Sequence, residues 1–479
     1  MTSNDNSPYK LGFMVESHRH RGNHAPPLFE VDHRGAIGFI EEARNKDQLM
    51  ESIQAVKGMN DILPGQIGWW QAVEQTASDL LENFGYREIR TPVLEKLELF
   101  ARGIGESTDI VEKEMYAFAD RKGDRLALRP EATASIVRAF IEHNLQSDSP
   151  VQKYYAIGPM FRHERPQKGR YRQFHQLDAE VFGIDDPAID AEMMFMLRVF
   201  LERLGLTGVV LHINSLGCPQ CRRAYREQLQ AFMEERADDF CPDCQRRRTT
   251  NPLRAFDCKV ARCQAHLEGA PVLLHSICSD CAAHFEQVKS YLHQLDTPFE
   301  VDPRMVRGLD YYMRTTFEII TDRLGAQNAV GGGGRYNGLV RDLGGPDIPG
   351  IGFAIGLERL ILLLQQEQER NKRAPKVFLA AIGDAARAKG FLLTQKLRVS
   401  GVEAEMDYEG KSLKSQMRRA DKLGAQYVLI IGDDEVNRGE AQLRNMKDKG
   451  QEMIPLETVV ETLKKVCVAE APAFCSPGL

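Results

Sequence analysis

The stretch that most constrains the fold is Tyr154–Gly183, which has the pattern of a strand, a charged loop and a second strand. β-forming residues fill positions 154–161 and 177–182, and the turn formers Pro166 and Gly169 separate them. The loop is rich in cations: Arg162, Arg165, Lys168, Arg170 and Arg172. Arginine suits phosphates, because its fork of donors matches phosphate oxygens and its charge does not titrate. Taken alone, such a loop is better explained as a solvated basic hairpin.

The second strand of this stretch alternates polar and apolar residues. Gln176, Asp178 and Glu180 are separated by single apolar positions, which is the period of a strand with two different faces. The polar face either lines a pocket or is half exposed. Glu164 can orient a neighbouring arginine, and Phe174 can offer a flat ring to a base.

The whole stretch resembles motif 2 of the class II aminoacyl-tRNA synthetases, in the form found in the bacterial histidyl-tRNA synthetase family. The resemblance implies that Arg162 contacts the amino-acid carboxylate and the α-phosphate of ATP. It implies that Glu164 and Arg170 bind the adenine end and the γ-phosphate, with adenine stacked on Phe174. It also implies four further contacts: Gln176 with the amino acid, Glu180 with its imidazole, and Gln167 and Arg172 with the acceptor end of tRNA.

A second element, RGLDYY, occupies Arg307–Tyr312 and leads into a predicted strand that ends near Ile320. Alone, an arginine before two tyrosines is more often an ordinary surface turn. Beside motif 2, it resembles the element that marks histidyl-tRNA synthetases among class II enzymes. The resemblance implies that Arg307, with Arg162, is catalytic and offers a fixed positive charge to the α-phosphate. Tyr311 and Tyr312 would then shape the histidine pocket.

The glycine run Gly331–Gly334 allows close approach of other groups to the backbone. It is either a flexible turn or, by the resemblance, a backbone wall beside the bound adenylate, with Tyr336 near the substrate. Residues 350–364 predict a strand that passes into an apolar helix. Arg359 lies on the first turn of that helix, and a buried charge needs a partner. It matches the motif 3 arginine, which implies that its partner is the γ-phosphate of ATP.

Two segments before motif 2 have weaker patterns. Residues 66–84 have helical spacing, and residues 86–95 predict a strand interrupted by Pro92, which is typical of a sheet edge. This part resembles motif 1, which implies a dimer interface. Residues 125–139 predict a strand followed by a helix. Glu131 and Thr133 either cap that helix or, by the resemblance, bind the ammonium group of the amino acid.

Eight of the ten cysteines lie between residues 215 and 300, in a stretch with helical spacing. The pairs Cys218/Cys221, Cys241/Cys244 and Cys278/Cys281 have CxxC spacing, which is typical of zinc ligands, and Cys258/Cys263 is a wider pair. Three interpretations compete. A structural zinc site from two of the CxxC pairs and inert free thiols are equally good explanations, and disulfides come third because no secretion signal precedes them.

The length of 479 residues suits about three domains. We expect an extension over residues 1–49, disordered or dispensable. The catalytic domain would span 50–370 and contain the insertion at 215–300. After a polar linker, residues 375–466 alternate strands and helices and predict an α/β layer with largely parallel pairing. This layer resembles a class IIa anticodon-binding domain, followed by a tail over 467–479. One helix carries the cations Lys411, Lys414, Arg418, Arg419 and Lys422. Such a helix face is usually only solvated, but the resemblance makes it a candidate RNA surface.

Composition excludes little. The formal net charge is -6, so any nucleic acid must bind local basic patches, and no apolar run is long enough to cross a bilayer.

The resemblance implies an α+β fold with a six-stranded antiparallel sheet flanked by helices. It implies a cytoplasmic homodimer that uses ATP with Mg to join L-histidine to tRNA-His. The rival hypotheses are a catalytically inactive regulatory paralogue and a synthetase for another amino acid.

Overall fold

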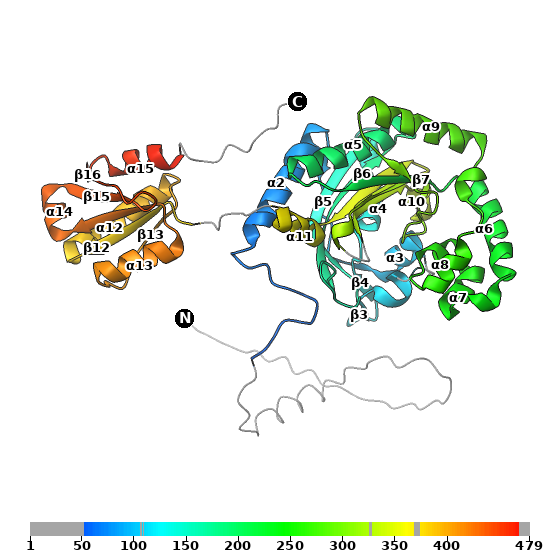
Figure 1. The fold of residues 1–479 in the computed structure, drawn as a ribbon, viewed down its shortest axis with the longest axis horizontal. Helices are drawn as coiled ribbons and strands as arrows, with labels where there is room; N and C mark the ends of the chain where they lie inside the picture. Colours follow the sequence, from blue (N-terminus) through cyan, green and yellow to red (C-terminus); the bar gives the residue numbers. More distant parts are fainter. Residues whose placement is uncertain (1–51, 106–107, 109, 325–327, 368–373, 469–479) are drawn as a thin grey trace, which may run out of the picture. The chain divides into compact units, whose positions relative to one another are not determined.

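The structure is a computed structural model that describes residues 52–105, 108, 110–324, 328–367 and 374–468 (Figure 1). The chain divides into two units, Met1–Gln54 and Ala55–Leu479, and all that follows concerns the second. The expected N-terminal extension over residues 1–49 lies outside the described residues. No helix among the described residues is long and apolar enough to cross a membrane.

The largest sheet has eight strands in the order β1-β5-β6-β11-β10-β9-β7-β8. Its six central strands pair antiparallel throughout, as the resemblance implied. The expectation of six strands omitted β1 and β8, two-residue strands that pair parallel at the two edges. The bounds are β1 Arg87–Glu88, β5 Gln152–Phe161, β6 Gln173–Phe182, β7 Val210–Ser215, β8 Glu300–Val301, β9 Met313–Ile320, β10 Ala329–Arg335 and β11 Gly350–Gly356.

The hairpin of β5 and β6 is the predicted strand–loop–strand element, in register from Gln152 opposite Phe182 to Phe161 opposite Gln173. Alternate residues of β6 face opposite sides of the sheet. Leu177, Ala179 and Val181 pack into a large apolar core. That core also contains buried side chains of the helices α2 Ile67–Asn83, α5 Pro187–Arg203, α9 Ser279–Gln294 and α11 Leu357–Glu367.

The other face of the sheet packs against α4, Thr133–Glu142, and against the start of the helical insertion. A separate three-stranded sheet, in the order β2-β4-β3, lies with α3 beside this part of the chain. The remaining bounds here are β2 Leu94–Lys96, α3 Leu97–Ile104, β3 Ala117–Ala119, β4 Arg125–Leu128 and α10 Leu339–Asp342. Pro92 therefore separates two short strands of different sheets, as an interrupted strand predicts.

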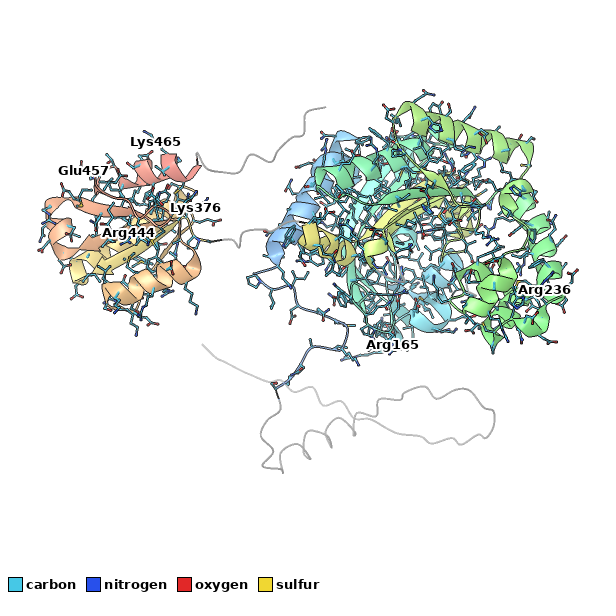
Figure 2. The ribbon with its side chains drawn as sticks, viewed as in Figure 1. Arg165, Arg236, Lys376, Arg444, Glu457 and Lys465 are labelled. Atoms are coloured by element: carbon cyan, nitrogen blue, oxygen red, sulfur yellow. The ribbon has the colours of Figure 1, made fainter. Side chains whose placement is uncertain are left out.

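The loop between β5 and β6 has Gly169 at φ +72°, a torsion that favours glycine. Its outer cations Arg165 and Lys168 are exposed (Figure 2). The insertion between β7 and β8 is helical, as predicted, with α6 Pro219–Glu234, α7 Pro242–Thr250, α8 Ala261–Leu267 and α9.

The C-terminal part has its own core and a five-stranded sheet in the order β13-β12-β14-β15-β16. The prediction of largely parallel pairing is wrong for half of the strand pairs. Strand β12 pairs parallel with β13 and β14, but β14–β15 and β15–β16 are antiparallel. The bounds are β12 Val377–Ile382, α12 Asp384–Val399, β13 Ala404–Met406, α13 Leu413–Leu423, β14 Tyr427–Gly432, α14 Asp433–Arg438, β15 Glu440–Asn445, β16 Gln451–Pro455 and α15 Val459–Val468. Cys467, expected in a tail, is buried on α15.

Candidate functional site

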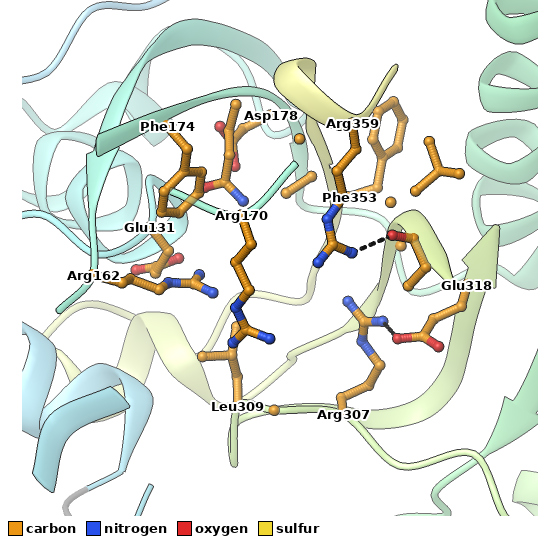
Figure 3. A pocket seen from close by; sticks show the side chains of 18 of the residues that line it. Glu131, Arg162, Arg170, Phe174, Asp178, Arg307, Leu309, Glu318, Phe353 and Arg359 are labelled. Atoms are coloured by element: carbon orange, nitrogen blue, oxygen red, sulfur yellow. Dashed lines mark hydrogen bonds and ion pairs between the residues drawn. The ribbon is translucent and has the colours of Figure 1, made fainter. Parts of the chain in front are cut away.

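A pocket of about 290 Å³ opens on the polar face of the sheet, between the β5–β6 loop and the RGLDYY segment (Figure 3). Side chains from motif 2, the RGLDYY segment and α11 line it, although nearly two hundred positions separate Arg162 from Arg359. Eleven residues predicted from the sequence lie in its wall: Glu131, Thr133, Arg162, Glu164, Arg170, Phe174, Gln176, Arg307, Tyr311, Tyr312 and Arg359.

Four arginines line the pocket: Arg162, Arg170, Arg307 and Arg359, of which Arg162 lies next to Glu131 (Figure 3). Backbone carbonyls hold two of them in place. Arg162 Nε donates to the carbonyl of Pro130 at 2.9 Å, and Arg359 Nη1 donates to the carbonyl of Ala329 at 2.5 Å. Burial lowers the pKa of both guanidinium groups. A backbone carbonyl orients a guanidinium group without adding a full negative charge beside it.

Carboxylates hold the other two arginines. Arg170 pairs with Glu164, and Arg307 pairs with Glu318. Burial lowers the pKa of Arg170 to about 10. For Arg307, burial favours the neutral form, but Glu318 together with Tyr312 and Tyr311 outweighs burial, and the pKa is raised. Arg307 is therefore a fixed cation at neutral pH.

Phe174 lies beside Arg162, whose guanidinium carbon is 5.2 Å from the centre of the ring. The contact is a cation–π interaction. The ring of Phe174 also lines the pocket, so it can present a flat apolar surface to a ligand.

Beside Arg162 the pocket has an acidic end, which includes Glu131 and Asp178. Glu131 accepts hydrogen bonds from the backbone N–H groups of Thr133 and Ala134, at 2.8 and 2.9 Å. The capping interpretation of Glu131 is therefore confirmed, and its carboxylate still faces the pocket. Thr133 is the first residue of α4, and its hydroxyl donates to Glu180 at 2.6 Å.

Glu180 and Tyr336 lie beneath the wall of the pocket rather than in it. Glu180 is 1% exposed and accepts hydrogen bonds from the hydroxyls of Thr133 and Tyr336. Burial raises its pKa well above the ordinary range of a carboxyl group. The rings of Tyr311, Tyr312 and Tyr336 contact one another around this carboxylate, with centroids 4.6 and 5.6 Å apart for the pairs that include Tyr311.

Asp178 was not assigned to the site from the sequence, although the alternation of β6 placed it on the polar face. It lines the pocket and is 1% exposed. Neither of its carboxylate oxygens has a hydrogen-bond partner among the described residues, and Oε1 of Gln176 has none either. Burial, followed by the charge of Glu131, raises the pKa of Asp178 well above its usual value. These buried acceptors point to a ligand that brings N–H donors.

Two other carboxylates of the wall were also missed. Glu318 lies on β9 and pairs with Arg307. Glu358 accepts hydrogen bonds from the backbone N–H of His175, at 2.9 Å, and lies 3.0 Å from its Nδ1. The sequence around Glu318 and Glu358 did not predict these contacts, because the partners Arg307 and His175 are more than ten positions away in the chain.

The glycine run forms the strand β10, so the flexible-turn alternative is wrong. Gly331 and Gly332 line the pocket, and a Cβ on Gly332 would lie 2.5 Å from the carbonyl of Phe317 and 2.8 Å from Nη1 of Arg307. The strand therefore forms a bare backbone wall beside Arg307.

Gln167 and Arg172 do not line this pocket. Gln167 is exposed in the loop and pairs with the backbone of Arg170. The backbone N–H of Arg172 donates to the carbonyl of Gly58 at 2.7 Å, and its side chain contacts the carbonyl of Glu164. Both residues lie on the loop that borders the site.

The eight cysteines of the insertion form two groups of four: Cys218, Cys221, Cys278 and Cys281, and Cys241, Cys244, Cys258 and Cys263. The sequence did not indicate which pairs would meet, and the predicted ligand set omitted Cys258 and Cys263.

The family model described as histidyl-tRNA synthetase matches residues 58–360, which is more than half of the chain. The chain belongs to the histidyl-tRNA synthetase family. A second family model, described as an anticodon binding domain, matches residues 376–466. Membership of this family confirms the resemblance that the motifs carried.

Curated relatives agree with the synthetase family models. The chain is 55% identical over 409 residues to the histidine–tRNA ligase of Desulfatibacillum aliphaticivorans, covering 85% of this chain and 98% of that protein. It is 54% identical over 412 residues to the histidine–tRNA ligase of Syntrophotalea carbinolica, covering 86% and 98%. The solved structure of apo histidyl-tRNA synthetase from S. aureus superposes with a TM-score of 0.74 at 37% identity, covering 86% of this chain and all of that one.

Proposed function

We propose that the protein is a histidine–tRNA ligase, which activates L-histidine with ATP and transfers it to the 3′ end of tRNA-His. The observation that carries this proposal is one pocket lined by four arginines and, beside Arg162, by the buried carboxylates Glu131 and Asp178. Arginines suit the phosphates of ATP, whereas buried acceptors suit the ammonium and imidazole N–H groups of histidine. Family membership supports the same assignment.

In the first step, an oxygen of the histidine carboxylate attacks the α-phosphorus of ATP, and the bond to pyrophosphate breaks. Pyrophosphate leaves with the bonding electron pair, and histidyl-adenylate forms. Arg307 and Arg162 would stabilise the negative charge that develops on the α-phosphate, because they are already positioned before the reaction. Arg170 and Arg359 would bind the outer phosphates, with adenine on Phe174.

In the second step, a hydroxyl of the terminal ribose of tRNA attacks the histidyl carbonyl carbon, and AMP leaves. The protein acts by positioning and by charge stabilisation. Mg²⁺ accompanies ATP as part of the substrate. The carboxylate of Glu318 lies beside Arg307 in the pocket and offers the oxygen ligands that Mg²⁺ prefers.

The acidic end would select histidine. Gln176 and Asp178 have unpaired buried oxygens that a ligand N–H would satisfy, and Glu180 lies deepest, held by Thr133 and Tyr336. Glu131 and Thr133 would bind the α-ammonium group. A substrate without matching donors would leave these groups unpaired, which is the strongest form of discrimination available to a binding site.

We assign the domains as expected from the sequence, with a catalytic domain over 50–370 and an anticodon-binding domain over 375–466. The match to the anticodon-binding family and the exposed cations of α13 support an RNA surface there. Gln167 and Arg172 would contact the acceptor end of tRNA. We also propose a cytoplasmic homodimer, in keeping with the motif 1 resemblance of residues 66–95, and structural zinc in the insertion.

The test of this function is ATP–pyrophosphate exchange with each of the twenty amino acids, without tRNA. Exchange with histidine alone is the expected result. Exchange with a different amino acid would identify a sibling synthetase. No exchange from folded protein would favour a regulatory paralogue, although the four arginines of the pocket are what an ATP-using enzyme needs.

A further inference from the structure

The insertion between β7 and β8 brings eight cysteines together as two separate groups of four. The first group, the root cluster, consists of Cys218, Cys221, Cys278 and Cys281. The second group, the inner cluster, consists of Cys241, Cys244, Cys258 and Cys263. We infer that each cluster binds one zinc ion through four thiolates, and that the two centres position the histidine-binding loop Arg307–Tyr312.

The sulfur spacing fits zinc. In each cluster the four Sγ atoms lie within 4.8 Å of one another. The Sγ atoms of Cys218 and Cys221 are 3.5 Å apart, and those of Cys241 and Cys258 are 3.8 Å apart. Four sulfurs around a tetrahedral zinc at about 2.3 Å from the metal are separated by about 3.8 Å. A disulfide would instead bring two sulfurs to about 2.0 Å and leave the other two aside.

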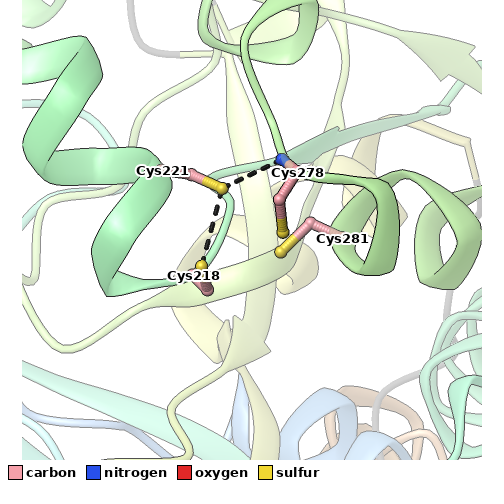
Figure 4. Close-up of side chains that lie close together, drawn as sticks. All are labelled: Cys218, Cys221, Cys278 and Cys281. Atoms are coloured by element: carbon pink, nitrogen blue, oxygen red, sulfur yellow. Dashed lines mark hydrogen bonds between the residues drawn. The ribbon is translucent and has the colours of Figure 1, made fainter.

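Both clusters share one local design. The pairs Cys218/Cys221 and Cys241/Cys244 each begin a helix, with the first cysteine at the N-cap and proline after it. In each cluster, the backbone N–H of an N-cap cysteine donates to a sulfur of the other pair. Cys278 N donates to Cys221 Sγ at 3.1 Å (Figure 4), and Cys241 N donates to Cys263 Sγ at 3.2 Å. Such bonds orient metal ligands and favour the thiolate.

The convergence of the cysteines in fours, rather than their burial, argues against inert thiols. Cys221 and Cys281 of the root cluster are buried, and all of the inner cluster is buried except Cys241. Buried thiols also occur as small apolar side chains, but such residues do not need to converge in fours. A bound metal would add crosslinks to this helical module beyond the apolar packing that it shares with α4 and the sheet.

The root cluster lies beside the RGLDYY loop. Arg222, the residue after Cys221, donates from Nη1 to the carbonyl of Tyr312 at 2.8 Å and to that of Asp310 at 3.3 Å. Gly217, the residue before Cys218 of the root cluster, accepts a hydrogen bond from the backbone N–H of Arg314 at 2.9 Å. The position of the loop backbone therefore depends on where the cluster fixes the start of α6.

The inner cluster holds a second set of contacts to the same loop. Residues 251–254 lie between Cys244 and Cys258. Asn251 Nδ2 donates to Oδ1 of Asp310 at 2.9 Å, and Arg254 Nη1 donates to the carbonyl of Arg307 at 2.9 Å. The loop Arg307–Tyr312 has no regular helix or strand of its own, so its path depends on contacts with its neighbours: the insertion, Ile104 and Glu318. This step rests on the proposed role of that loop in binding histidine.

The first experiment counts zinc in the full-length enzyme, purified without chelators, and titrates its free thiols under denaturing conditions. We expect two zinc ions per chain, and thiolate-to-cobalt absorption after cobalt replaces zinc. Cys258→Ser/Cys263→Ser and Cys278→Ser/Cys281→Ser should each reduce the count to one. Fewer than two zinc ions in the wild type, with all thiols titratable or with pairs oxidised, would overturn the proposal even if no variant folds.

The second experiment tests the positioning role with Arg222→Ala, measured by ATP–pyrophosphate exchange. We expect the zinc count to stay at two, the KM for histidine to rise roughly tenfold, and the KM for ATP to change little, since lost charged hydrogen bonds shift the loop. Arg222→Lys should restore part of the loss. Arg223→Ala, an exposed neighbour, is the matched control. An unchanged KM in Arg222→Ala would remove the positioning role and leave the metal count as a separate result.

Discussion

The two ends of the pocket differ in how they hold charge. At the arginine end, the cations are charged at neutral pH and are fixed by backbone carbonyls or by carboxylates. At the acidic end, burial raises the pKa of Asp178 and Glu180 well above the usual range. The arginines have hydrogen-bond or ion-pair partners without a ligand, whereas neither carboxylate oxygen of Asp178 has a hydrogen-bond partner among the described residues.

The difference follows from the chemistry of the two ions. A guanidinium has five donors and keeps its proton in almost any environment. A carboxylate that loses water without gaining donors takes up a proton instead. The arginine end is therefore preorganised for phosphate, whereas the acidic end gains its charge when a cationic, N–H-rich ligand arrives.

The largest effect should come from the arginine end. Arg307→Ala should lower the rate of ATP–pyrophosphate exchange by roughly 10²–10³-fold, the usual result of removing one preorganised charge from a transition state. Equilibrium binding of histidine alone should change little. Arg323→Ala removes a similar Arg–Glu pair, with Glu367, outside the pocket, and should leave the rate within about twofold. Unchanged exchange in Arg307→Ala would refute the catalytic role.

At the acidic end, Glu180→Gln should act on histidine rather than on ATP. The change removes the charge that accepts from Thr133 and Tyr336, and a hydrogen bond to a charged group is worth about 1.5–3 kcal/mol. We expect the KM for histidine to rise about 10–100-fold, with a nearly constant KM for ATP. Glu142→Gln, on the exposed face of α4, is the control. A rise confined to ATP would reverse the assignment of the two ends.

Gly352→Ala should produce a similar but smaller effect. A Cβ at this position would lie 1.6 Å from Oε2 of Glu180, so the carboxylate would have to move. We expect roughly a tenfold rise in the KM for histidine, because its hydrogen-bond geometry is lost. Gly68→Ala, whose Cβ meets nothing within 4 Å on α2, should leave the kinetics unchanged and favour the helix slightly. Equal kinetics in the two variants would contradict the role of Glu180.

The smallest effect concerns how the folding stability of the ligand-free protein changes with pH. The pKa of Asp178 is raised in the folded state, so that state binds more protons than the unfolded chain. The resulting stabilisation is complete below the ordinary carboxyl pKa and is lost as the pH rises through the raised value. Each pH unit by which the pKa is higher in the folded protein than in the unfolded chain contributes about 1.4 kcal/mol to the free energy of unfolding. Melting curves of wild type and Asp178→Asn from acidic to neutral pH should converge at low pH and diverge at neutral pH, where the variant is more stable.

An exposed control for this comparison is Asp148→Asn, which should follow the wild-type profile. Parallel curves for Asp178→Asn and wild type across the whole range would show that the buried carboxyl does not bind a proton on folding.

Much of the catalytic fold could be predicted from the sequence, because local pattern and family motif agreed. The hairpin of β5 and β6, the helix after β11 and the helical insertion all lie where apolar periodicity placed them. The C-terminal hairpin β15–β16 was missed, because Glu440–Pro455 is mostly polar and its alternation is short: only Ala441 and Leu443 alternate with polar residues. This hairpin is part of the sheet because β15 pairs with the neighbouring strand β14.

The prediction of site residues had the same limit: it depended on local sequence patterns. Residues in contiguous motifs were predicted, and partners that meet only through the fold were not. Glu318 and Arg307 lie on different segments, and nothing in the sequence near Glu318 shows that they meet. The pairing of cysteines was undetermined for the same reason, since eight cysteines allow many combinations. Asp178 could have been assigned, because the alternation of β6 already placed it beside Gln176 and Glu180.

The insertion contacts the RGLDYY loop chiefly through backbone carbonyls, those of Arg307, Asp310 and Tyr312. A carbonyl is the same in every residue, so these contacts do not depend on the side chains that the loop presents to the pocket. Substitutions at Tyr311 and Leu309 would therefore leave these backbone contacts available, although both side chains also pack against apolar cores. Libraries that alter amino-acid specificity at these positions would start from a loop that is already anchored.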